Sequence, residues 1–297
     1  MTQRCYAARG LRRLAAGAGG AALALLLAGC GQKSELASAG GPLAGGRYVA
    51  MGSSFAAGPG IGKLKPGTPP RCGRSFDNYA TLLAEDMRMT LFDVTCGGAS
   101  TAHILGPWNE LTAQINAVTA DTRLVTVTVG GNDIGYVGYL IGQSCQSRAP
   151  MRFRGREIPC SALKAPDEAA YQRLGISLRA IAAGVKRRAP EAQLVFVQYV
   201  TLVPETLCAD TPLSPEAADT AREIGRRLAQ ITAQAAQDSA AMLAEADVLS
   251  AGHTPCDGAP WSVGHPEASG SITGAPWHPN RAGHAALARV LAEKLGS

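Results

Sequence analysis

Short apolar runs alternate with longer amphipathic stretches from Arg47 to the end of the chain, and this alternation constrains the fold more than any other feature of the sequence. A short run rich in valine, leucine and isoleucine predicts a buried strand. A longer stretch with apolar residues three or four positions apart predicts a helix. Strands that alternate with helices form a mainly parallel sheet with helices on both of its faces. We therefore predict an α/β fold with three α/β/α layers and a mainly parallel, five-stranded sheet.

The bounds of the expected elements follow from the same patterns. Strands are expected at Tyr48–Met51, Leu91–Thr95, Leu124–Val129, Leu194–Tyr199 and Val248–Ser250. Helices are expected near residues 76–88, 108–118, 167–188, 214–246 and 280–295, the last with Asn280 as its N-cap. Because no second linker interrupts this rhythm, we expect residues 46–297 to form a single domain.

Residues 135–166 interrupt the alternation of strands and helices. This stretch holds two cysteines, several glycines and a basic segment from Arg152 to Arg156. In a sheet of the expected kind it leaves the carboxyl edge of a strand, which is where ligands bind. The sequence is equally consistent with a flap on the substrate side and with an inert excursion on the surface.

The N-terminus has the layout of an export signal. A basic region with four arginines precedes an apolar run from Leu14 to Ala28, which is too short for a comfortable membrane span. The run ends in LAGC at Cys30, which resembles the lipobox of bacterial lipoproteins, where the cysteine is diacylated and becomes the new N-terminus. The alternative is an ordinary signal peptide whose small residues precede a cysteine by chance.

These features predict how the N-terminal part of the chain is divided and where the protein is found. We expect residues 1–30 to be a lipoprotein signal peptide and residues 31–45, which are small and polar, to be a flexible tether. The protein is expected to be exported to the cell envelope, where lipid on Cys30 anchors it to the membrane. Without that lipid it would be secreted.

The charge of the chain excludes one class of partner. The net charge of +5 includes the four arginines of the first 30 residues, which leaves +1 for the remainder. No cluster of lysine and arginine in that remainder resembles a stripe that follows phosphates. We therefore expect no nucleic-acid partner.

The cysteines also favour an exported protein. Apart from Cys5 in the signal peptide and the lipidated Cys30, six remain: Cys72, Cys96, Cys145, Cys160, Cys208 and Cys256. An even number in an exported chain predicts three disulfides. A zinc site would need close C-x-x-C pairs with further pairs or histidines nearby, and the sequence has none. We expect neither a metal nor a cofactor.

Four short segments hold residue types suited to catalysis, and three of them directly follow an expected strand. These segments are GSSFAAG at 52–58, CGGAS at 96–100, GGND at 130–133 and HPN at 278–280. Each glycine-rich turn, taken alone, is weak evidence because such turns usually have no role beyond the turn itself. Since parallel strands end at the same edge of a sheet, however, side chains from all of these turns can meet there.

Taken together, the four segments resemble the sequence blocks of the SGNH hydrolases, the GDSL-type esterases and lipases. YVAMGSSFAAGPG at 48–60 is similar to the first block, with Ser53 in place of the usual Asp. CGGA at 96–99, GGND at 130–133 and HPNRAGH at 278–284 resemble the other three, in the same order. The resemblance covers residues 47–297 and implies the flavodoxin-like fold of that family.

The resemblance implies a carboxylic ester hydrolase that acts through an acyl-enzyme. Ser54 would be the nucleophile and His278 its general base. The oxyanion hole would consist of the Ser54 N–H, the Gly98 N–H and the Asn132 side chain. Ser53 adjoins Ser54 but occupies the position of the family's nonessential Asp. The ester could belong to a lipid or to an acylated small molecule.

Two alternatives to this function stay open. The first is a carbohydrate acetyl esterase that acts on cell-surface polysaccharide, because members of this family also remove acetyl groups. The second is a lipoprotein that keeps the fold but only binds envelope components. The intact set of Ser54, Gly98, Asn132 and His278 argues against the second alternative.

Secreted relatives of this kind imply a sequential disulfide pairing, namely Cys72–Cys96, Cys145–Cys160 and Cys208–Cys256. For the histidine, many relatives carry an Asp three residues upstream, where this chain has Ala275. Since some family members use a backbone carbonyl instead, we expect the Ala275 carbonyl to orient His278 in a Ser-His dyad. Asp257 or Glu267 could complete a triad only if a loop folded back to the histidine.

Overall fold

The computed structural model describes residues 41–147, 152–153, 156–157, 164–265 and 274–296. All of these described residues belong to one compact unit, and residues 1–40 lie outside the described part of the chain. The predicted signal peptide, Cys30 and most of the predicted tether therefore lie outside it. No helix among the described residues is both long and apolar enough to cross a membrane.

Five parallel strands form the central sheet in the order β2-β1-β3-β6-β7. Their bounds are β1 Arg47–Gly52, β2 Thr90–Asp93, β3 Thr122–Thr128, β6 Gln193–Val197 and β7 Met242–Ala244. β1 and β3 are almost wholly buried, as expected for central strands that are covered on both faces. The predicted three-layer fold with a parallel five-stranded sheet is confirmed.

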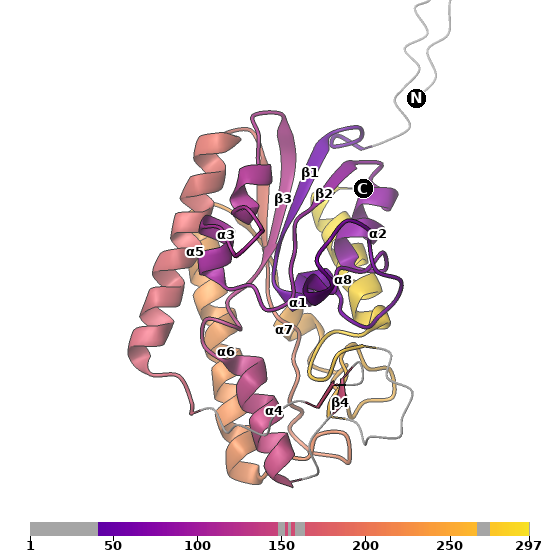
Figure 1. Ribbon diagram of the computed structural model, residues 1–297, viewed down its shortest axis with the longest axis vertical. Coiled ribbons are helices and arrows are strands. Elements are labelled where there is room, and N and C mark those ends of the chain that lie inside the picture. The colour runs from indigo at the N-terminus through magenta and orange to yellow at the C-terminus, as the bar shows by residue number, and fades with distance from the viewer. Residues whose placement is uncertain (1–40, 148–151, 154–155, 158–163, 266–273, 297) are drawn as a thin grey trace, which may run out of the picture. The chain divides into compact units, whose positions relative to one another are not determined.

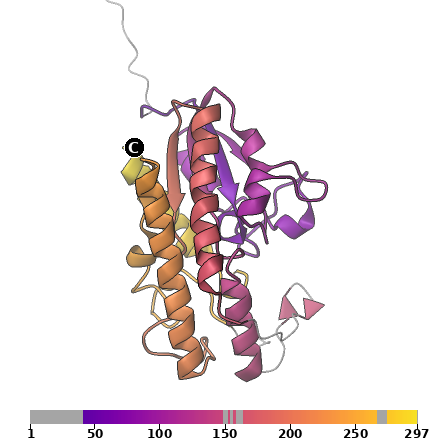
Figure 2. The ribbon, with the colours of Figure 1, turned by 90° about the vertical axis from the view of Figure 1, so that its left-hand side faces the viewer.

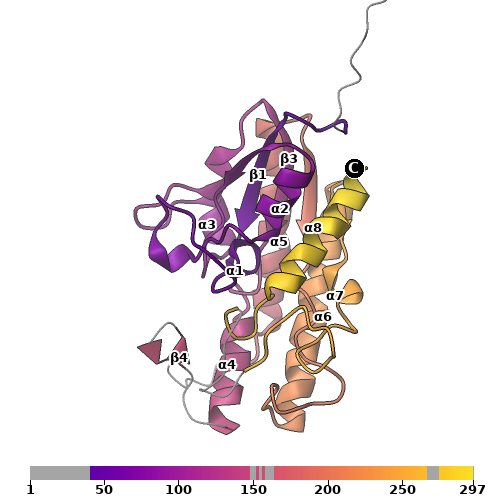
Figure 3. The same ribbon diagram turned by 90° about the vertical axis from the view of Figure 1, so that its right-hand side faces the viewer.

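Helices cover both faces of this sheet, as Figures 1 to 3 show from three directions. The helices α2 and α8 pack against each other on one face, while α5 pairs with α6 and α3 on the other. The long helices begin at side-chain caps, which satisfy N–H groups of the first turn. Helix bounds are α1 Ser54–Ala57, α2 Tyr79–Asp86, α3 Thr101–Leu105, α4 Tyr136–Ser147, α5 Glu168–Arg188, α6 Pro215–Asp238, α7 Ala246–Leu249 and α8 Arg281–Leu295, with 3₁₀ helices η1 Pro70–Cys72 and η2 Gln114–Ala117.

Three of the expected elements differ from the structure. The stretch expected as the last strand, Val248–Ser250, begins within helix α7, and Val248 is 68% exposed. The true fifth strand, β7, lies inside the stretch predicted as one long helix, because the alanine-rich pattern of α6 continues past the turn at Ala240, where φ is +52°. The helix expected at 108–118 is absent: Trp108 and Leu111 form an isolated β-bridge, and only η2 is helical there.

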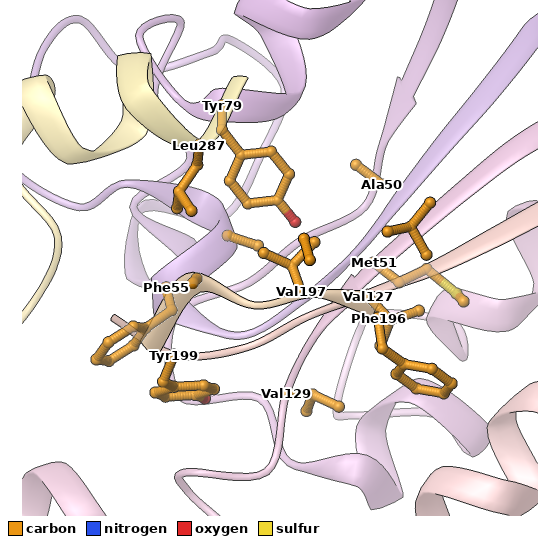
Figure 4. Close-up of a cluster of buried hydrophobic side chains, with 14 of the residues drawn as sticks. Ala50, Met51, Phe55, Tyr79, Val127, Val129, Phe196, Val197, Tyr199 and Leu287 are labelled. Atoms are coloured by element: carbon orange, nitrogen blue, oxygen red, sulfur yellow. The ribbon is translucent and has the colours of Figure 1, made fainter. Parts of the chain in front are cut away.

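The hydrophobic core lies between the sheet and its two helical layers. Figure 4 shows the sheet residues Met51, Val127 and Phe196 together with Tyr79 of α2 and Leu287 of α8. All five side chains are essentially buried. This packing makes the sheet a rigid base, and the turns that follow β1, β2, β3 and β6 meet at its carboxyl edge.

The interrupting stretch at 135–166 contains regular structure of its own. Its first part is helix α4, which packs against α6. Beyond α4, the two short strands β4 Arg152–Phe153 and β5 Arg156–Glu157 pair in antiparallel fashion. Residues 148–151, 154–155 and 158–163 of the stretch lie outside the described part of the chain.

Two of the three expected disulfides are present among the described residues, Cys72–Cys96 and Cys208–Cys256. Cys145 is also disulfide-bonded, but its expected partner Cys160 lies outside the described residues.

Candidate active site

The turn after β1 presents one of two adjacent serines at the sheet edge. Ser53 caps α1 and is fully buried, with its Oγ 2.8 Å from the Tyr199 hydroxyl. Ser54 is the first residue of α1 and retains 9% exposure. The turn requires glycine at position 52, where φ is +149° and a Cβ would lie 2.5 Å from the Thr128 carbonyl oxygen.

His278 binds the second serine of this pair, Ser54. The His278 Nε2 lies 2.7 Å from Ser54 Oγ, although the two residues are 224 positions apart in the chain. On the other side of the ring, His278 Nδ1 lies 2.6 Å from the Pro276 carbonyl oxygen. Since a carbonyl only accepts, Nδ1 carries the proton and donates it, and Nε2 accepts from the Ser54 hydroxyl.

The carbonyl that orients His278 is that of Pro276, so the prediction of Ala275 is wrong by one residue. The reason is the backbone at Trp277, which adopts a left-handed conformation with φ of +54°. The Trp277 N–H donates to the Gly264 carbonyl at 3.0 Å, which holds this turn in place. The turn folds the chain so that the carbonyl two residues before His278, rather than three, faces the imidazole.

No described carboxylate hydrogen-bonds to His278. Asp257 instead accepts from the Thr254 N–H and hydroxyl, both at 2.7 Å, and closes its own turn. Glu267, the other residue considered for a triad, lies outside the described residues.

Burial shapes the acid–base properties of His278. Removal of the imidazole from water lowers the pKa of His278 to about 4, and the hydrogen bond to Pro276 only partly opposes this shift. The Phe55 ring contributes to the burial, with its centroid 4.9 Å from that of the imidazole. His278 is therefore neutral, and able to accept a proton, well into the acidic range.

The backbone N–H groups of Ser54 and Gly98 at this edge have no acceptor among the described residues. The Ser54 N–H belongs to the first turn of α1, where N–H groups have no partner within the helix. Gly98 has a φ of +82°, a conformation that favours glycine, and a Cβ there would lie 3.3 Å from the Trp108 ring. Next to it, the Gly97 N–H donates to Cys72 at 2.8 Å, close to the disulfide between Cys72 and Cys96.

Asn132 and Asp133 link the turn after β3 to the turn after β2. Asn132 Nδ2 donates to the Ala99 carbonyl at 2.8 Å. An amide nitrogen carries two protons, so one remains for a ligand. The Asp133 carboxylate accepts from the Thr101 N–H at 3.1 Å and also from the Thr101 hydroxyl. Asp133 therefore braces the two turns, although burial raises its pKa.

The segment that carries His278 is held from two sides. The fully buried Trp277 donates from Nε1 to the Ser144 hydroxyl of α4 at 3.1 Å. On the other side, the Val263 N–H donates to the His278 carbonyl at 2.9 Å. Part of the interrupting stretch therefore supports the turn that presents the histidine.

The sequence analysis missed two side chains that contact the catalytic turns. Gln114 forms a pair of hydrogen bonds with the Gly52 backbone, at 2.7 and 3.1 Å. Tyr199 contacts both Ser53 and Gly131. The sequence indicated Tyr199 only as a residue with a polar group at the carboxyl end of an expected strand. Gln114 gave no signal, because it lies in a stretch with a helical pattern.

His284 is buried in α8, where its Nδ1 accepts the Tyr79 N–H at 3.1 Å. The structure contains no group of three or more His, Cys, Asp or Glu side chains suited to a metal within its described residues.

Comparisons with known proteins identify the family of this chain. Residues 50–286 match the sequence model of the GDSL-like lipase/acylhydrolase family. Lipase 2 of Streptomyces coelicolor is 30% identical over 273 residues, covering 84% of this chain and 85% of the relative. A lipase of Streptomyces rimosus is 29% identical over 238 residues, covering 76% and 83% of the two chains.

Among solved structures, the extracellular lipase of Streptomyces rimosus superimposes with a TM-score of 0.64 at 24% identity, covering 84% of this chain and 99% of that structure. Phospholipase A1 of Streptomyces albidoflavus gives a TM-score of 0.66 at 24% identity, covering 84% and 100%. Both likenesses show a shared fold.

Proposed function

We propose a two-residue serine mechanism for this chain, which belongs to the GDSL-like lipase/acylhydrolase family and is an ester hydrolase of the esterase/lipase type. The observation that carries the proposal is the hydrogen bond of 2.7 Å between Ser54 Oγ and His278 Nε2. A hydroxyl is a weak nucleophile until an adjacent base removes its proton. The neutral imidazole, with Nε2 free to accept, is such a base.

In the first half of the reaction, the Ser54 proton moves to His278 Nε2 while Oγ forms a bond to the carbonyl carbon of the ester. The tetrahedral intermediate then collapses, the bond to the alcohol breaks, and the Nε2 proton goes to the leaving alcohol. In the second half, the same nitrogen takes a proton from water, which attacks the acyl-enzyme. Collapse of this second intermediate releases the carboxylic acid and returns the proton to Ser54.

The negative charge that develops on the ester oxygen needs donors that are already in place. We assign the Ser54 N–H, the Gly98 N–H and the second Nδ2 proton of Asn132 to this role. Support comes from the absence of an acceptor for the Ser54 and Gly98 N–H groups among the described residues and from the bond that orients Asn132. Loss of one such donor typically lowers the rate by about 10²–10³-fold.

Hydrolysis of p-nitrophenyl esters of graded chain length tests the proposed function. We expect turnover of these esters by the wild-type protein and none by a Ser54→Ala variant. Preference for the acetate over every longer ester would favour the acetyl esterase alternative. Absence of turnover with every ester would favour a binding protein.

For localisation, we propose that the chain is exported and that lipid on Cys30 anchors it. One support for export is the likeness to an extracellular lipase. Another is the presence of disulfides, which form in oxidising compartments. The division into a signal peptide at 1–30, a tether at 31–45 and a hydrolase domain at 46–297 remains part of this proposal.

The first described residue of the domain lies at the end of the sheet opposite the active site. Gly41, the first described residue, lies beside Gly296, since a Cβ on Gly41 would be 3.7 Å from the Gly296 carbonyl oxygen. This is the end where β1 begins, and Ser54 follows the other end of that strand (Figure 1). Cell fractionation of wild type and Cys30→Ser tests the anchor. We expect esterase activity to move from membranes to the soluble fraction, and an unchanged distribution would contradict the anchor.

A further inference from the structure

Tyr199 joins two turns that belong to different strands. It lies two residues after β6 ends, at the carboxyl edge of the sheet, and is 6% exposed. Its hydroxyl oxygen lies 2.8 Å from Ser53 Oγ and accepts the Gly131 N–H at 3.1 Å. Ser53 directly precedes the nucleophile, and Gly131 directly precedes Asn132. A single oxygen atom therefore holds the residues that adjoin two of the proposed oxyanion donors.

The Tyr199 ring fills the space between these turns. A Cβ on Gly131 would lie 2.6 Å from Cε1 of the ring, which explains the need for glycine at this position of the GGND segment. The ring also packs on the Phe55 ring (Figure 4), and the two ring centroids are 3.9 Å apart. Phe55 in turn lies against the His278 imidazole. Tyr199 thus contacts the nucleophile turn through both its hydroxyl and its ring.

The hydroxyl can keep this place at every pH at which the enzyme would work. Burial raises the pKa of Tyr199 far above its ordinary value, so the phenol stays neutral. The Gly131 N–H can only donate, so the Tyr199 oxygen is its acceptor. The phenol proton remains for the bond with Ser53, whose Oγ also caps the Phe55 N–H at 3.4 Å. A buried network in which each member has a partner is rigid.

We propose that Tyr199 is a positioning residue of this hydrolase, which sets the spacing between the Ser54 N–H and the Asn132 side chain by joining Ser53 to Gly131. The inference rests on the proposed function of Ser54 and Asn132. Electrostatic stabilisation of an oxyanion depends on donors that need no reorganisation during the reaction. Loss of the Tyr199 hydroxyl would remove neither donor but would loosen the two donors relative to each other.

Tyr199→Phe tests the proposal, with Tyr48→Phe as its matched control. Tyr48 is also buried, and its hydroxyl lies 2.7 Å from the Thr126 hydroxyl, so both variants lose one buried hydroxyl that bonds to another hydroxyl. Only Tyr199 contacts the catalytic turns. We expect kcat of Tyr199→Phe to fall about tenfold to a hundredfold, with KM within about twofold of the wild-type value. This loss is smaller than the loss of kcat on removal of one oxyanion donor, because both donors are still present. Tyr48→Phe should keep kcat within about twofold at a similar loss of Tm.

A kcat of Tyr199→Phe equal to that of Tyr48→Phe would overturn the proposal. A higher KM of Tyr199→Phe with an unchanged kcat would overturn it as well, because the variant would then have lost uniform substrate binding rather than positioning of the donors. A double-mutant cycle with Ser53→Ala supplies a second measure, since two changes that break the same bond should affect kcat non-additively. Additive effects of the two substitutions on kcat would contradict a role of the hydrogen bond between Tyr199 and Ser53 in turnover. Activity that survives in Ser54→Ala would instead refute the proposed function itself, whatever Tyr199→Phe does.

Discussion

The Pro276 carbonyl oxygen lies 2.6 Å from His278 Nδ1 and occupies the place that a carboxylate holds in a Ser-His-Asp triad. A carbonyl can fix the tautomer and the ring orientation, as the carboxylate does. It carries only a partial charge, however, and stabilises the imidazolium less. The shift in the His278 pKa follows from this arrangement, because burial lowers the pKa and no described carboxylate raises it.

The pH dependence of the activity should therefore extend into the acidic range. The acid limb of kcat/KM reports the free enzyme, and we expect it near the His278 pKa of about 4 rather than near 6.5. Activity at pH 5.5 should remain close to that at pH 7. Measurement with a neutral p-nitrophenyl ester over pH 4–8 checks this. An acid limb centred near 6.5 would contradict it.

The same burial makes the stability of the fold depend on pH. The pKa values of His278 and His284 are lowered to about 4 and about 3, below the value near 6.5 of an unfolded chain. As the pH falls below about 6.5, the unfolded state therefore binds protons that the folded state does not. Each imidazole should lower the free energy of unfolding by up to about 1.4 kcal/mol per pH unit towards pH 4. Urea unfolding at pH 7, 6 and 5 measures how the free energy of unfolding changes with pH. A free energy of unfolding that stays constant over this range would show that His278 and His284 are not both neutral in the folded protein.

Substitution of the two adjacent serines should separate their roles. Ser54→Ala is expected to abolish ester hydrolysis and labelling by a fluorophosphonate, because it removes the Oγ that contacts His278. Ser53→Ala should retain labelling because Ser54 Oγ is still present. Its kcat should stay within about tenfold, since the change breaks only one of the two hydrogen bonds of the Tyr199 hydroxyl. Peptide mapping of the adduct identifies the nucleophile. An adduct on Ser53 would reverse the assignment.

Asn132→Ala should act on turnover rather than on binding. The side chain that donates to Ala99 would no longer offer its second proton to the oxyanion. We expect kcat to fall about 10²–10³-fold with a much smaller change in KM. Steady-state kinetics with one ester suffices. A rise in KM at constant kcat would place Asn132 in ground-state binding instead.

Asp257→Asn tests whether a distant carboxylate assists His278. The Asp257 carboxylate caps its own turn through Thr254, so its loss should leave kcat within about twofold. Glu267→Gln is the companion variant. Loss of orders of magnitude in kcat with either variant would show a triad and refute the dyad.

Removal of the Cys208–Cys256 disulfide should destabilise the fold. The bond closes a stretch with a sequence separation of 48 residues. In the chain-entropy model, a closed loop of that length contributes about 4 kcal/mol to the free energy of unfolding. Chemical unfolding of Cys208→Ser/Cys256→Ser against wild type measures the loss. A difference below about 1 kcal/mol would show that the unfolded state is already compact.

The sequence by itself determined the class of the fold and most of the residues proposed for the site. Strand and helix periodicities are local, and β1, β3 and β6 were recognisable because central strands are buried along most of their length. The catalytic segments were also local, since each consists of a few residues in a tight turn. The order of the four segments along the chain then made the resemblance to the hydrolase family specific.

Tertiary structure alone decided which groups support those residues. Gln114 hydrogen-bonds to Gly52, which is 62 positions away in the chain, and Tyr199 hydrogen-bonds to Ser53, which is 146 positions away. No local sequence pattern encodes such contacts. The edge strand β7 forms because β6 offers free hydrogen-bonding groups to an alanine-rich stretch that looks helical alone. The Pro276 carbonyl, rather than that of Ala275, faces His278 because the backbone of Trp277 is left-handed. Two hydrogen bonds hold Trp277 in place, one from its backbone N–H to the Gly264 carbonyl and one from its Nε1 to the Ser144 hydroxyl. Backbone direction at one residue is set by partners far away in sequence, so only the folded chain reveals which atom faces the histidine.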